Sequence, residues 1–243
     1  MSNASLAAAN AARWAKARVT RASQFNTVAK RLIANKARYQ AVAAKTGVPW
    51  FVIAVIHQRE SSGNFAGVLH NGEKIIGTGK KTRLVPAGRG PFSTWEQAAI
   101  DALTNCGPYA ARNKDWSVGG TLALLERYNG LGYANRGLPS PYIWSGTDQY
   151  VKGKYVRDHV FDPNAVDQQL GCAGLIKAMQ ALDPSIKFGA ASKPSGAGAL
   201  ATAAGGAVVA TGAAQGGFGW PVVIAIAAVA IAVTAFIIWK RGR

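Results

Sequence analysis

Acidic residues are absent from the first 59 positions of this 243-residue chain, which hold ten Lys and Arg residues. Residues 60–183 carry all eleven Asp and Glu residues against thirteen Lys and Arg residues, so they contribute only +2 to the formal charge of +17. The positive excess therefore belongs to the two ends of the chain. A basic segment suits an anionic partner such as phospholipid, nucleic acid or an acidic wall polymer, and the charge pattern does not choose among them.

Cysteine and histidine are scarce. Cys106 and Cys172 form no Cys-x-x-Cys motif, and His57, His70 and His159 show no metal-ligand spacing. We therefore expect no metal and no cofactor. Two buried free thiols are the favoured interpretation of the cysteines, and a single disulfide stays open.

The N-terminal part also lacks a secretory signal, because its basic and alanine residues include no dense apolar core. Residues 1–22 form an Ala-rich basic arm, predicted to be a frayed or surface helix that touches a membrane or, equally, a plain solvated arm. From residue 23 onward, apolar side chains recur at helical spacing until Gly47, and Pro49 suits the first turn of a second helix. Residues 50–59 are apolar nearly all round, which is typical of a helix in the centre of a domain.

Turn-forming residues dominate positions 66–92. Asn71-Gly72 is a strong hairpin signal, and it predicts a small β-hairpin or an extended loop directly after Glu60. Ser93-Thr-Trp-Glu96 then predicts a capping box that opens a helix ending at Gly107.

Two more helices complete the predicted domain. One covers residues 122–128, and the last begins at Asp162-Pro163 and stops before Pro184. The expected fold class is a mostly α domain with one small β-hairpin, followed by one C-terminal transmembrane helix.

The last fifty residues change in composition. Ala, Gly, Ser and Thr dominate residues 189–219, which predicts a flexible linker. The next twenty residues are uncharged and flanked by Trp220 and Trp239, and a helix of this length spans roughly 30 Å of hydrocarbon. A basic tail follows. By the positive-inside tendency this tail favours a cytoplasmic C-terminus, whereas the basic N-terminal arm favours a cytoplasmic N-terminus. A single membrane span cannot satisfy both. The predicted segments are the arm 1–22, a domain 23–188, the linker 189–219, the membrane helix 220–239 and the tail 240–243.

Glu60 is the first acid in the chain and ends the apolar helix predicted over residues 50–59. A carboxyl group beside apolar surroundings is desolvated, which raises its pKa and lets it hold a proton near neutral pH. A general acid for glycoside cleavage needs this property. A solvated Glu at a helix end is the alternative interpretation.

A hydrolase also needs a second group, either a base that activates water or a nucleophile. Glu73, on the predicted turn, is the nearest acid in sequence to Glu60 and is the candidate for this role. Thr82 or Thr94 could instead position a water molecule through its hydroxyl group. A solvated turn acid and ordinary loop threonines are the alternatives.

Five stretches of the chain resemble the lysozyme superfamily. Glu60-Ser-Ser-Gly-Asn-Phe65 is similar to the Glu-Ser motif of goose-type lysozymes and lytic transglycosylases, and Leu125-Glu-Arg-Tyr-Asn-Gly-Leu-Gly-Tyr133 is similar to their Tyr-Asn-Gly segment. Val85-Pro-Ala-Gly-Arg-Gly-Pro-Phe92, Ser140-Pro-Tyr-Ile-Trp-Ser-Gly146 and Phe161-Asp-Pro163 resemble phage and prophage lysozyme-family proteins. The resemblance covers about half of the chain and implies a lysozyme-like α+β fold.

By this resemblance Glu60 is the catalytic acid, and Ser61, Tyr128 and Asn129 bind the saccharide. A stacked core residue is the alternative interpretation of Tyr128, and a helix C-cap is that of Asn129. The Gly-x-Met-Gln segment typical of the transglycosylases is missing, and Leu69 stands where another phage lysozyme group has its second Asp. The predicted catalytic set is therefore Glu60 with Glu73, and Thr82 is added to the predicted substrate-binding residues.

The favoured function is a membrane-anchored muramidase that cleaves peptidoglycan between N-acetylmuramic acid and N-acetylglucosamine, encoded by a phage. The alternatives are a lytic transglycosylase, a non-catalytic wall-binding protein and a cationic membrane-disrupting protein. The expected partners are peptidoglycan, a lipid bilayer of the host or the virion, and other virion or lysis proteins, with no specific nucleic acid.

Overall fold

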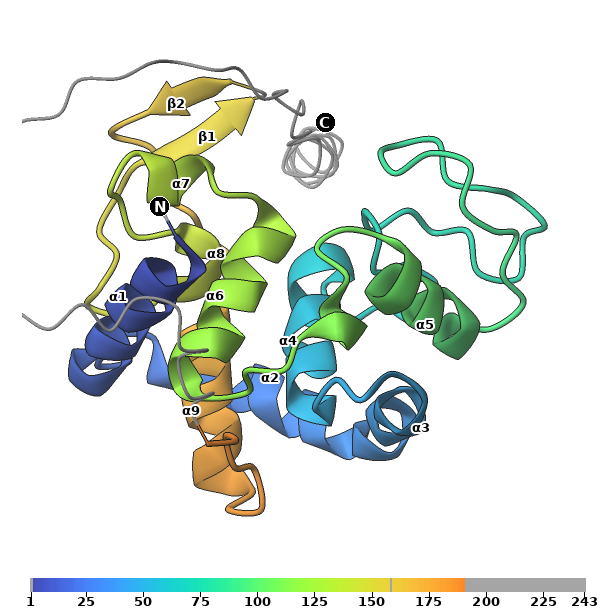
Figure 1. The fold of residues 1–243 in the computed structure, drawn as a ribbon, viewed down its shortest axis with the longest axis horizontal. Coiled ribbons are helices and arrows are strands. Elements are labelled where there is room, and N and C mark those ends of the chain that lie inside the picture. The colour runs from blue at the N-terminus through green and yellow to red at the C-terminus, as the bar shows by residue number, and fades with distance from the viewer. Residues whose placement is uncertain (1, 158, 191–243) are drawn as a thin grey trace, which may run out of the picture.

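A computed structural model describes residues 2–157 and 159–190 of the chain (Figure 1). This part is mostly helical and includes one two-stranded antiparallel sheet, which confirms the coarse fold class. The helices are α1 (Asn3–Lys16), α2 (Ala22–Ala34), α3 (Lys36–Thr46), α4 (Trp50–Ser61), α5 (Trp95–Asn105), α6 (Val118–Asn129), α7 (Gly132–Asn135), α8 (Pro141–Trp144) and α9 (Cys172–Leu182), with a 3₁₀ turn (Ala110–Arg112) and the strands β1 (Lys154–Arg157) and β2 (Val160–Asp162).

Helix α4 lies in the middle of the fold, as its apolar sequence predicts. Seven successive side chains, from Phe51 to His57, are buried, and α3, α6 and α9 all pack against this helix. Its last turn, which carries Glu60, ends at Ser62 in the left-handed conformation. The N–H groups of Ser62 and Gly63 donate to the carbonyls of Gln58 and His57, so the backbone around Glu60 is fixed by its own helix end.

The single helix predicted over residues 23–47 is wrong, because the chain breaks at Asn35 into α2 and α3. The side-chain amide of Asn35 donates to the Arg31 carbonyl at 2.9 Å, and its backbone N–H reaches the carbonyl of Leu32. An Asn that bonds to nearby backbone in this way offers the chain an alternative to a continuous helix. After the break α2 packs on α9, whereas α3 packs on α4 and α5.

Helix α1 belongs to the folded unit. The helix expected in residues 1–22 is present as a surface helix: one side packs along α6, and the other side is exposed. Leu6 and Asn10 are buried in this contact. Gly119 on α6 makes the close approach possible, because a Cβ there would lie 2.5 Å from the carbonyl oxygen of Ala7.

A buried polar group joins α1 to the rest of the fold. The amide of Asn10 donates to Glu126 Oε2 at 2.9 Å and accepts from Trp144 Nε1 at 3.2 Å. Burial raises the pKa of Glu126, and the bond from Asn10 opposes this rise. A cavity of about 40 Å³ lies beside these side chains.

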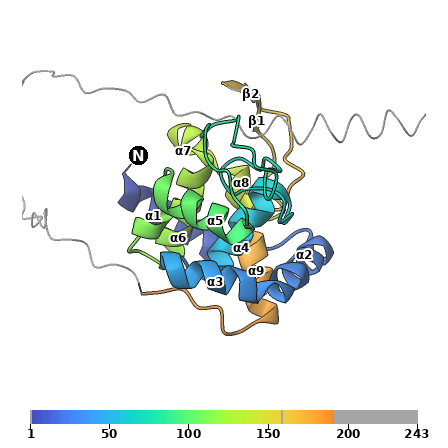
Figure 2. The same ribbon diagram turned by 90° about the vertical axis from the view of Figure 1, so that its right-hand side faces the viewer.

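The predicted β-hairpin in residues 66–92 is absent, and the extended loop named as its alternative is present. Asn71-Gly72 does reverse the chain, since the Val68 N–H donates to the Glu73 carbonyl at 3.0 Å, but only one isolated bridge, between Gly67 and Lys74, follows. The hairpin of the fold is formed instead by β1 and β2, which pair Lys154 with Asp162 in antiparallel register. In Figure 1 loop 66–92 lies beside α5, on the opposite side of the fold from the hairpin of β1 and β2, and Figure 2 views the fold from that side.

Two predicted helix starts are corrected. The capping box lies one residue later than predicted: Thr94 Oγ1 accepts from the Gln97 N–H, and Gln97 Oε1 accepts from the Thr94 N–H, both at 3.2 Å. Asp162 ends β2, and its carboxylate accepts from the N–H groups of the two residues after Pro163. These bonds hold a turn, so the last helix starts only at Cys172.

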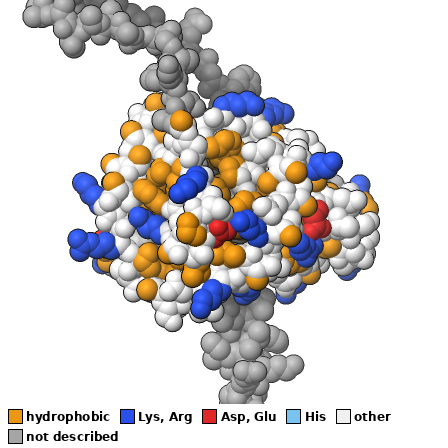
Figure 3. All heavy atoms as spheres, turned by 90° about the horizontal axis from the view of Figure 1, so that it is seen from below, with side chains coloured by type: hydrophobic (Ala, Val, Ile, Leu, Met, Phe, Trp, Pro, Cys, Tyr) orange, Lys and Arg blue, Asp and Glu red, His pale blue; other side chains and the backbone are white. Residues whose placement is uncertain are grey.

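The cysteines are both free, as favoured from the sequence, although only Cys172 is fully buried. The ten Lys and Arg residues of positions 1–59 lie on α1 to α4 and their connections. On the face seen in Figure 3, Lys and Arg side chains are spread widely, and acidic side chains are few.

No helix within residues 2–157 and 159–190 is both long and apolar enough to cross a membrane alone; α3 and α4 meet the requirement only as a pair bent by 112°. Residues 191–243, with most of the predicted linker, the predicted membrane helix 220–239 and the basic tail, lie outside the described residues.

Candidate active site

Glu60 projects from the last turn of α4, where α6, α8 and the start of loop 66–92 meet. Its Oε1 accepts a hydrogen bond from the Tyr142 hydroxyl at 2.8 Å. Its Oε2 is shielded from solvent and has no hydrogen-bond partner among the described residues. Burial raises the pKa of Glu60 from 4.5 to about 7, against the opposing effects of Tyr142 and Arg59. The sequence-based expectation of a desolvated carboxyl therefore agrees with the geometry.

Two tyrosines enclose this carboxyl. Tyr142, on α8, is buried, and Tyr128, near the end of α6, donates its hydroxyl to the Leu69 carbonyl at 2.9 Å. Burial, and next the negative charge of Glu60, raise the pKa of both phenols well above the ordinary value. Both tyrosines therefore stay protonated and act as hydrogen-bond donors at neutral pH.

A buried ion pair lies behind the tyrosines. The Arg59 guanidinium lies 4.7 Å from the ring centre of Tyr142 and 3.0 Å from Asp167 Oδ2, and the ammonium of Lys154 lies 3.1 Å from Asp167 Oδ1. Arg59 and Asp167 expose only 6% and 3% of their side chains, so this pair is desolvated. Burial alone would raise the pKa of Asp167, but Arg59 and Lys154 bring it below its ordinary value. The pair fixes the ring whose hydroxyl meets Glu60.

The saccharide-binding residues implied by the resemblance lie in this region, and they differ in burial and in whether their polar groups are already hydrogen-bonded. Tyr128 belongs to the wall just described, and Asn129, at the end of α6, is half-buried. Ser61 follows Glu60, but its hydroxyl lies 3.2 Å from the carbonyls of both His57 and Asn64. Ser61 therefore helps to close the end of α4.

Glu73, the predicted second catalytic group, is bonded within its own loop. Its Oε2 accepts from the side-chain amide of Asn71 at 3.0 Å and from the backbone N–H groups of Arg83 and Leu84 at 2.8 and 2.9 Å. Three donors on one oxygen tie the two halves of the loop together. These bonds explain why the loop keeps Glu73, and the geometry gives no support to its predicted catalytic role.

The threonine hydroxyl groups considered for positioning water are also in use. Thr82 is buried, donates to the Pro86 carbonyl at 2.6 Å and accepts from the Arg89 N–H at 2.9 Å. Thr94 caps α5. Neither hydroxyl is available for water next to Glu60, and the predicted substrate-binding role of Thr82 finds no support in the geometry.

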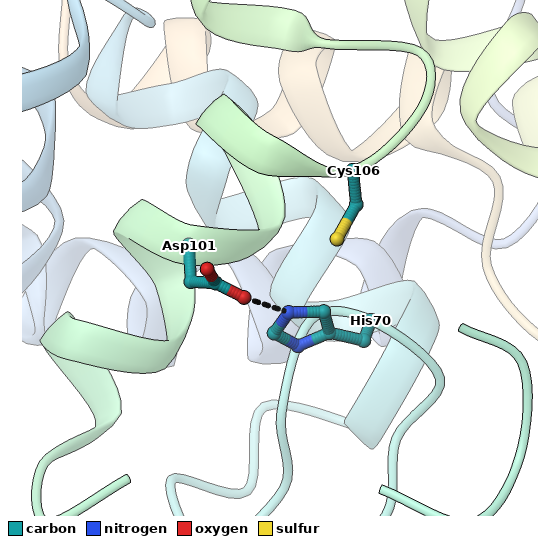
Figure 4. A group of neighbouring side chains, drawn as sticks. All are labelled: His70, Asp101 and Cys106. Carbon is teal, nitrogen blue, oxygen red and sulfur yellow. Dashed lines mark hydrogen bonds and ion pairs between the residues drawn. The ribbon is translucent and has the colours of Figure 1, made fainter. Parts of the chain in front are cut away.

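A second polar cluster lies between loop 66–92 and α5 (Figure 4). One ligand atom from each of His70, Asp101 and Cys106 lies within 4.8 Å of the others, close enough to hold a metal ion. His70 Nε2 donates to Asp101 Oδ2 at 2.8 Å, and burial lowers the pKa of His70 despite that carboxylate. The pattern had no recognisable spacing in the sequence, because the three residues come from a loop, a helix and the end of that helix.

The carboxylate of this cluster is already occupied. Besides His70, Asp101 Oδ2 accepts from Arg89 Nε at 2.8 Å, while Oδ1 accepts from Asn105 Nδ2 at 2.8 Å and from Arg89 Nη2. Burial alone would raise the pKa of Asp101, but these donors lower it to about 2. Four donors use the lone pairs that a cation would need, and Arg89 adds a positive charge beside them. The cluster therefore fits a network that ties the loop to α5 better than it fits a metal site.

No protein-family model, no curated protein and no solved structure matches this chain. The function of the chain is therefore inferred from the site itself and from the motifs that resemble the lysozyme superfamily.

The sequence missed the partners that set the properties of Glu60. Tyr142 lies in the stretch 140–146, which the sequence marks only by its resemblance, and no pattern in the sequence points to Arg59 or Asp167. The one available signal was Tyr142 inside a stretch already singled out for its resemblance.

Proposed function

We propose that this chain is a peptidoglycan-cleaving glycosidase, a muramidase that hydrolyses the β-1,4 bond between N-acetylmuramic acid and N-acetylglucosamine. The observation that carries the proposal is Glu60, a shielded carboxyl whose pKa of about 7 keeps about half of it protonated at neutral pH. An acid of this kind can protonate the leaving oxygen of a glycoside. The Glu60-Ser61 and Tyr128-Asn129-Gly130 motifs support peptidoglycan as the substrate class.

The acid proton and the hydrogen bond from Tyr142 lie on different oxygens of the Glu60 carboxyl group. Because Tyr142 donates to Oε1, the acid proton belongs on Oε2, which no described residue occupies. In the proposed reaction the bound saccharide displaces the side chains that cover Oε2, and this proton passes to the glycosidic oxygen while the bond from that oxygen to the anomeric carbon breaks. Water then adds to the oxocarbenium-like sugar and returns a proton to Glu60.

A lytic transglycosylase is the second candidate, and one observation favours it. Within residues 2–157 and 159–190, no other carboxylate bonds to Glu60 or shifts its pKa, and Glu73 is committed to the loop. Transglycosylation needs no second carboxylate, because a hydroxyl of the sugar itself attacks the anomeric carbon. Mass spectrometry of fragments released from sacculi by the full-length protein separates the two: reducing ends mark hydrolysis and anhydro-muramic ends mark transglycosylation. Release of neither kind of fragment would contradict both.

The proposed setting is a membrane. The uncharged segment 220–239 would anchor the enzyme in the host membrane at lysis or in the lipid layer of a virion, with other phage lysis or virion proteins as partners. Protease protection of each terminus in membrane vesicles tests this proposal and reports the orientation. Recovery of the full-length chain entirely in the aqueous fraction would contradict the anchor.

The hydrogen bond from Tyr142 sets the pH range of the proposed acid. That bond lowers the pKa of Glu60, so Tyr142→Phe should raise it, and the fall of activity at alkaline pH should move to higher pH. Phe keeps the ring against Arg59, which limits the change to the hydroxyl. The measurement is the pH dependence of kcat/KM on soluble peptidoglycan fragments. Tyr155→Phe, which removes a hydroxyl bonded to Arg136 on the β-hairpin, is the matched control and should leave the profile unchanged.

A further inference from the structure

Loop 66–92 carries an excess of exposed positive charge. Lys74, Lys80, Lys81 and Arg83 are all exposed, and none of them forms an ion pair with a described residue. The one acid of the loop is Glu73, whose carboxylate is bonded inside it. We call Lys80, Lys81 and Arg83 the basic triplet.

The backbone beneath the basic triplet is held on several sides. Glu73 accepts from the N–H groups of Arg83 and Leu84, and the Thr82 N–H and carbonyl bond to Arg89 and Gly88 at 2.9 and 2.8 Å. The Arg89–Asp101 pair then fastens this part of the loop to α5. A fixed backbone lowers the ordering cost of binding, because only the side chains lose freedom.

The base of the same loop packs on the end of α4 that carries Glu60. A Cβ at Gly72 would clash with the Glu60 carbonyl oxygen, and a Cβ at Gly67 would lie 2.6 Å from Ser61 Cβ. The Leu69 carbonyl accepts from Tyr128 of the site. The basic triplet therefore belongs to the loop whose base packs against the end of α4 that carries Glu60. Figure 1 shows this loop leaving α4 and passing α5.

We propose that the basic triplet binds the carboxylates of the peptide stems that peptidoglycan carries on its muramic acid residues. The inference rests on the proposed function for its choice of ligand. A glycan chain at Glu60 must direct its acidic substituents toward neighbouring surfaces, and this loop offers unpaired cations there. Ammonium and guanidinium groups bind carboxylates, and single exposed pairs are weak, so several cations against repeated stems are needed for a useful effect. The loop thereby distinguishes peptidoglycan from neutral β-1,4-linked glycans.

The test replaces the triplet in the full-length protein, as Lys80→Gln, Lys81→Gln and Arg83→Gln together. At low ionic strength KM for sacculi should rise about tenfold while kcat stays within about twofold, as expected for three exposed ion pairs. The matched control removes the same charge from exposed positions on α1, α2 and α3, through Lys16→Gln, Lys30→Gln and Lys45→Gln together, and should change KM by no more than about twofold. Sacculus binding is measured in parallel in a Glu60→Gln background, so that it does not depend on turnover.

Chemically modified sacculi identify the anion that the basic triplet binds. On sacculi whose carboxylates have been chemically amidated, the triplet variant and the unmodified loop should bind equally. An equal loss in the triplet and control variants would overturn the proposal, because charge alone would then explain binding. So would a difference that persists on amidated sacculi and disappears after removal of phosphate-containing wall polymers, because the ligand would then be phosphate. If no fragments are released from sacculi but the triplet still controls binding to them, the proposed function fails and the stem-binding surface stands.

Discussion

Glu60→Gln is expected to lower the rate of peptidoglycan cleavage by about 10²- to 10⁴-fold, the range that a general acid contributes. Gln keeps the shape of the side chain and an oxygen that accepts from Tyr142, but it has no acidic proton to give to the leaving oxygen. The loss should therefore appear in kcat, with little change in binding to sacculi. Release of soluble muropeptides over time is the measurement.

Glu96→Gln provides the comparison for this variant. Glu96 is also a helix glutamate, but it lies at the surface, 2.6 Å from Arg38, with 29% of its side chain exposed. Its replacement should leave cleavage unchanged. Full activity of Glu60→Gln would remove the proposed mechanism, and a wild-type protein that binds sacculi without cleaving them would favour the non-catalytic wall-binding alternative.

Glu60→Gln should also change how the free energy of unfolding depends on pH. The pKa of about 7 in the folded state lies above the ordinary 4.5, so the folded protein binds this proton more tightly than the unfolded chain. The stabilisation is full below pH 4.5 and is lost as the pH rises through 7. Because Gln does not titrate, the variant should gain stability relative to the wild type across this interval, as chemical denaturation at several pH values would show.

Asp167→Ala is expected to cost about 3–5 kcal/mol of unfolding free energy, the typical result of leaving a buried charge without its partner. Arg59 exposes only 6% of its side chain and would lose the carboxylate that lies 3.0 Å from it. Lys154 would lose the same partner. Urea denaturation measures the cost, and the freed positive charge beside Glu60 should also move the alkaline limb of activity to lower pH.

A second ion pair of this fold supplies the control. Lys36 and Asp183 lie 2.7 Å apart, but they expose 29% and 16% of their side chains. Asp183→Ala should therefore leave the unfolding free energy nearly unchanged, as is typical of exposed pairs. If both variants lost the same small amount of stability, the Arg59–Asp167 pair would not hold the site as described.

The parts of the fold that local sequence determines were predictable. Residues 50–59 are apolar on every side, which leaves little choice except a central helix, and the terminal position of Glu60 follows from Gly63 and the polar residues before it. The break at Asn35 was not predictable, because apolar spacing continues across it and only the side-chain bond to Arg31 reveals the interruption.

The other features of the fold and the site depend on contacts between residues distant in sequence, so local patterns could not predict them. Asn71-Gly72 signals a turn in either a hairpin or a loop, and the side chains of Asn71 and Glu73 take up the backbone groups of residues 83 and 84 that a strand would use. The strands that do form contain four and three residues, too few for a clear alternation. Tyr142 lies 82 positions from Glu60, so no spacing rule could have connected the phenol with the acid.

The packing of α1 on α6 changes how the basic N-terminal part can act. Its Lys and Arg residues do not belong to a flexible arm. They keep fixed positions relative to Glu60, because they are part of one folded unit. A field with this fixed geometry both attracts an anionic surface and turns the molecule as it approaches. Electrostatic steering by these cations together would then present the acid to the wall at the first encounter. The loss of three of them, as in the control for the basic triplet, should change the encounter little, whereas salt would slow it by screening the whole field.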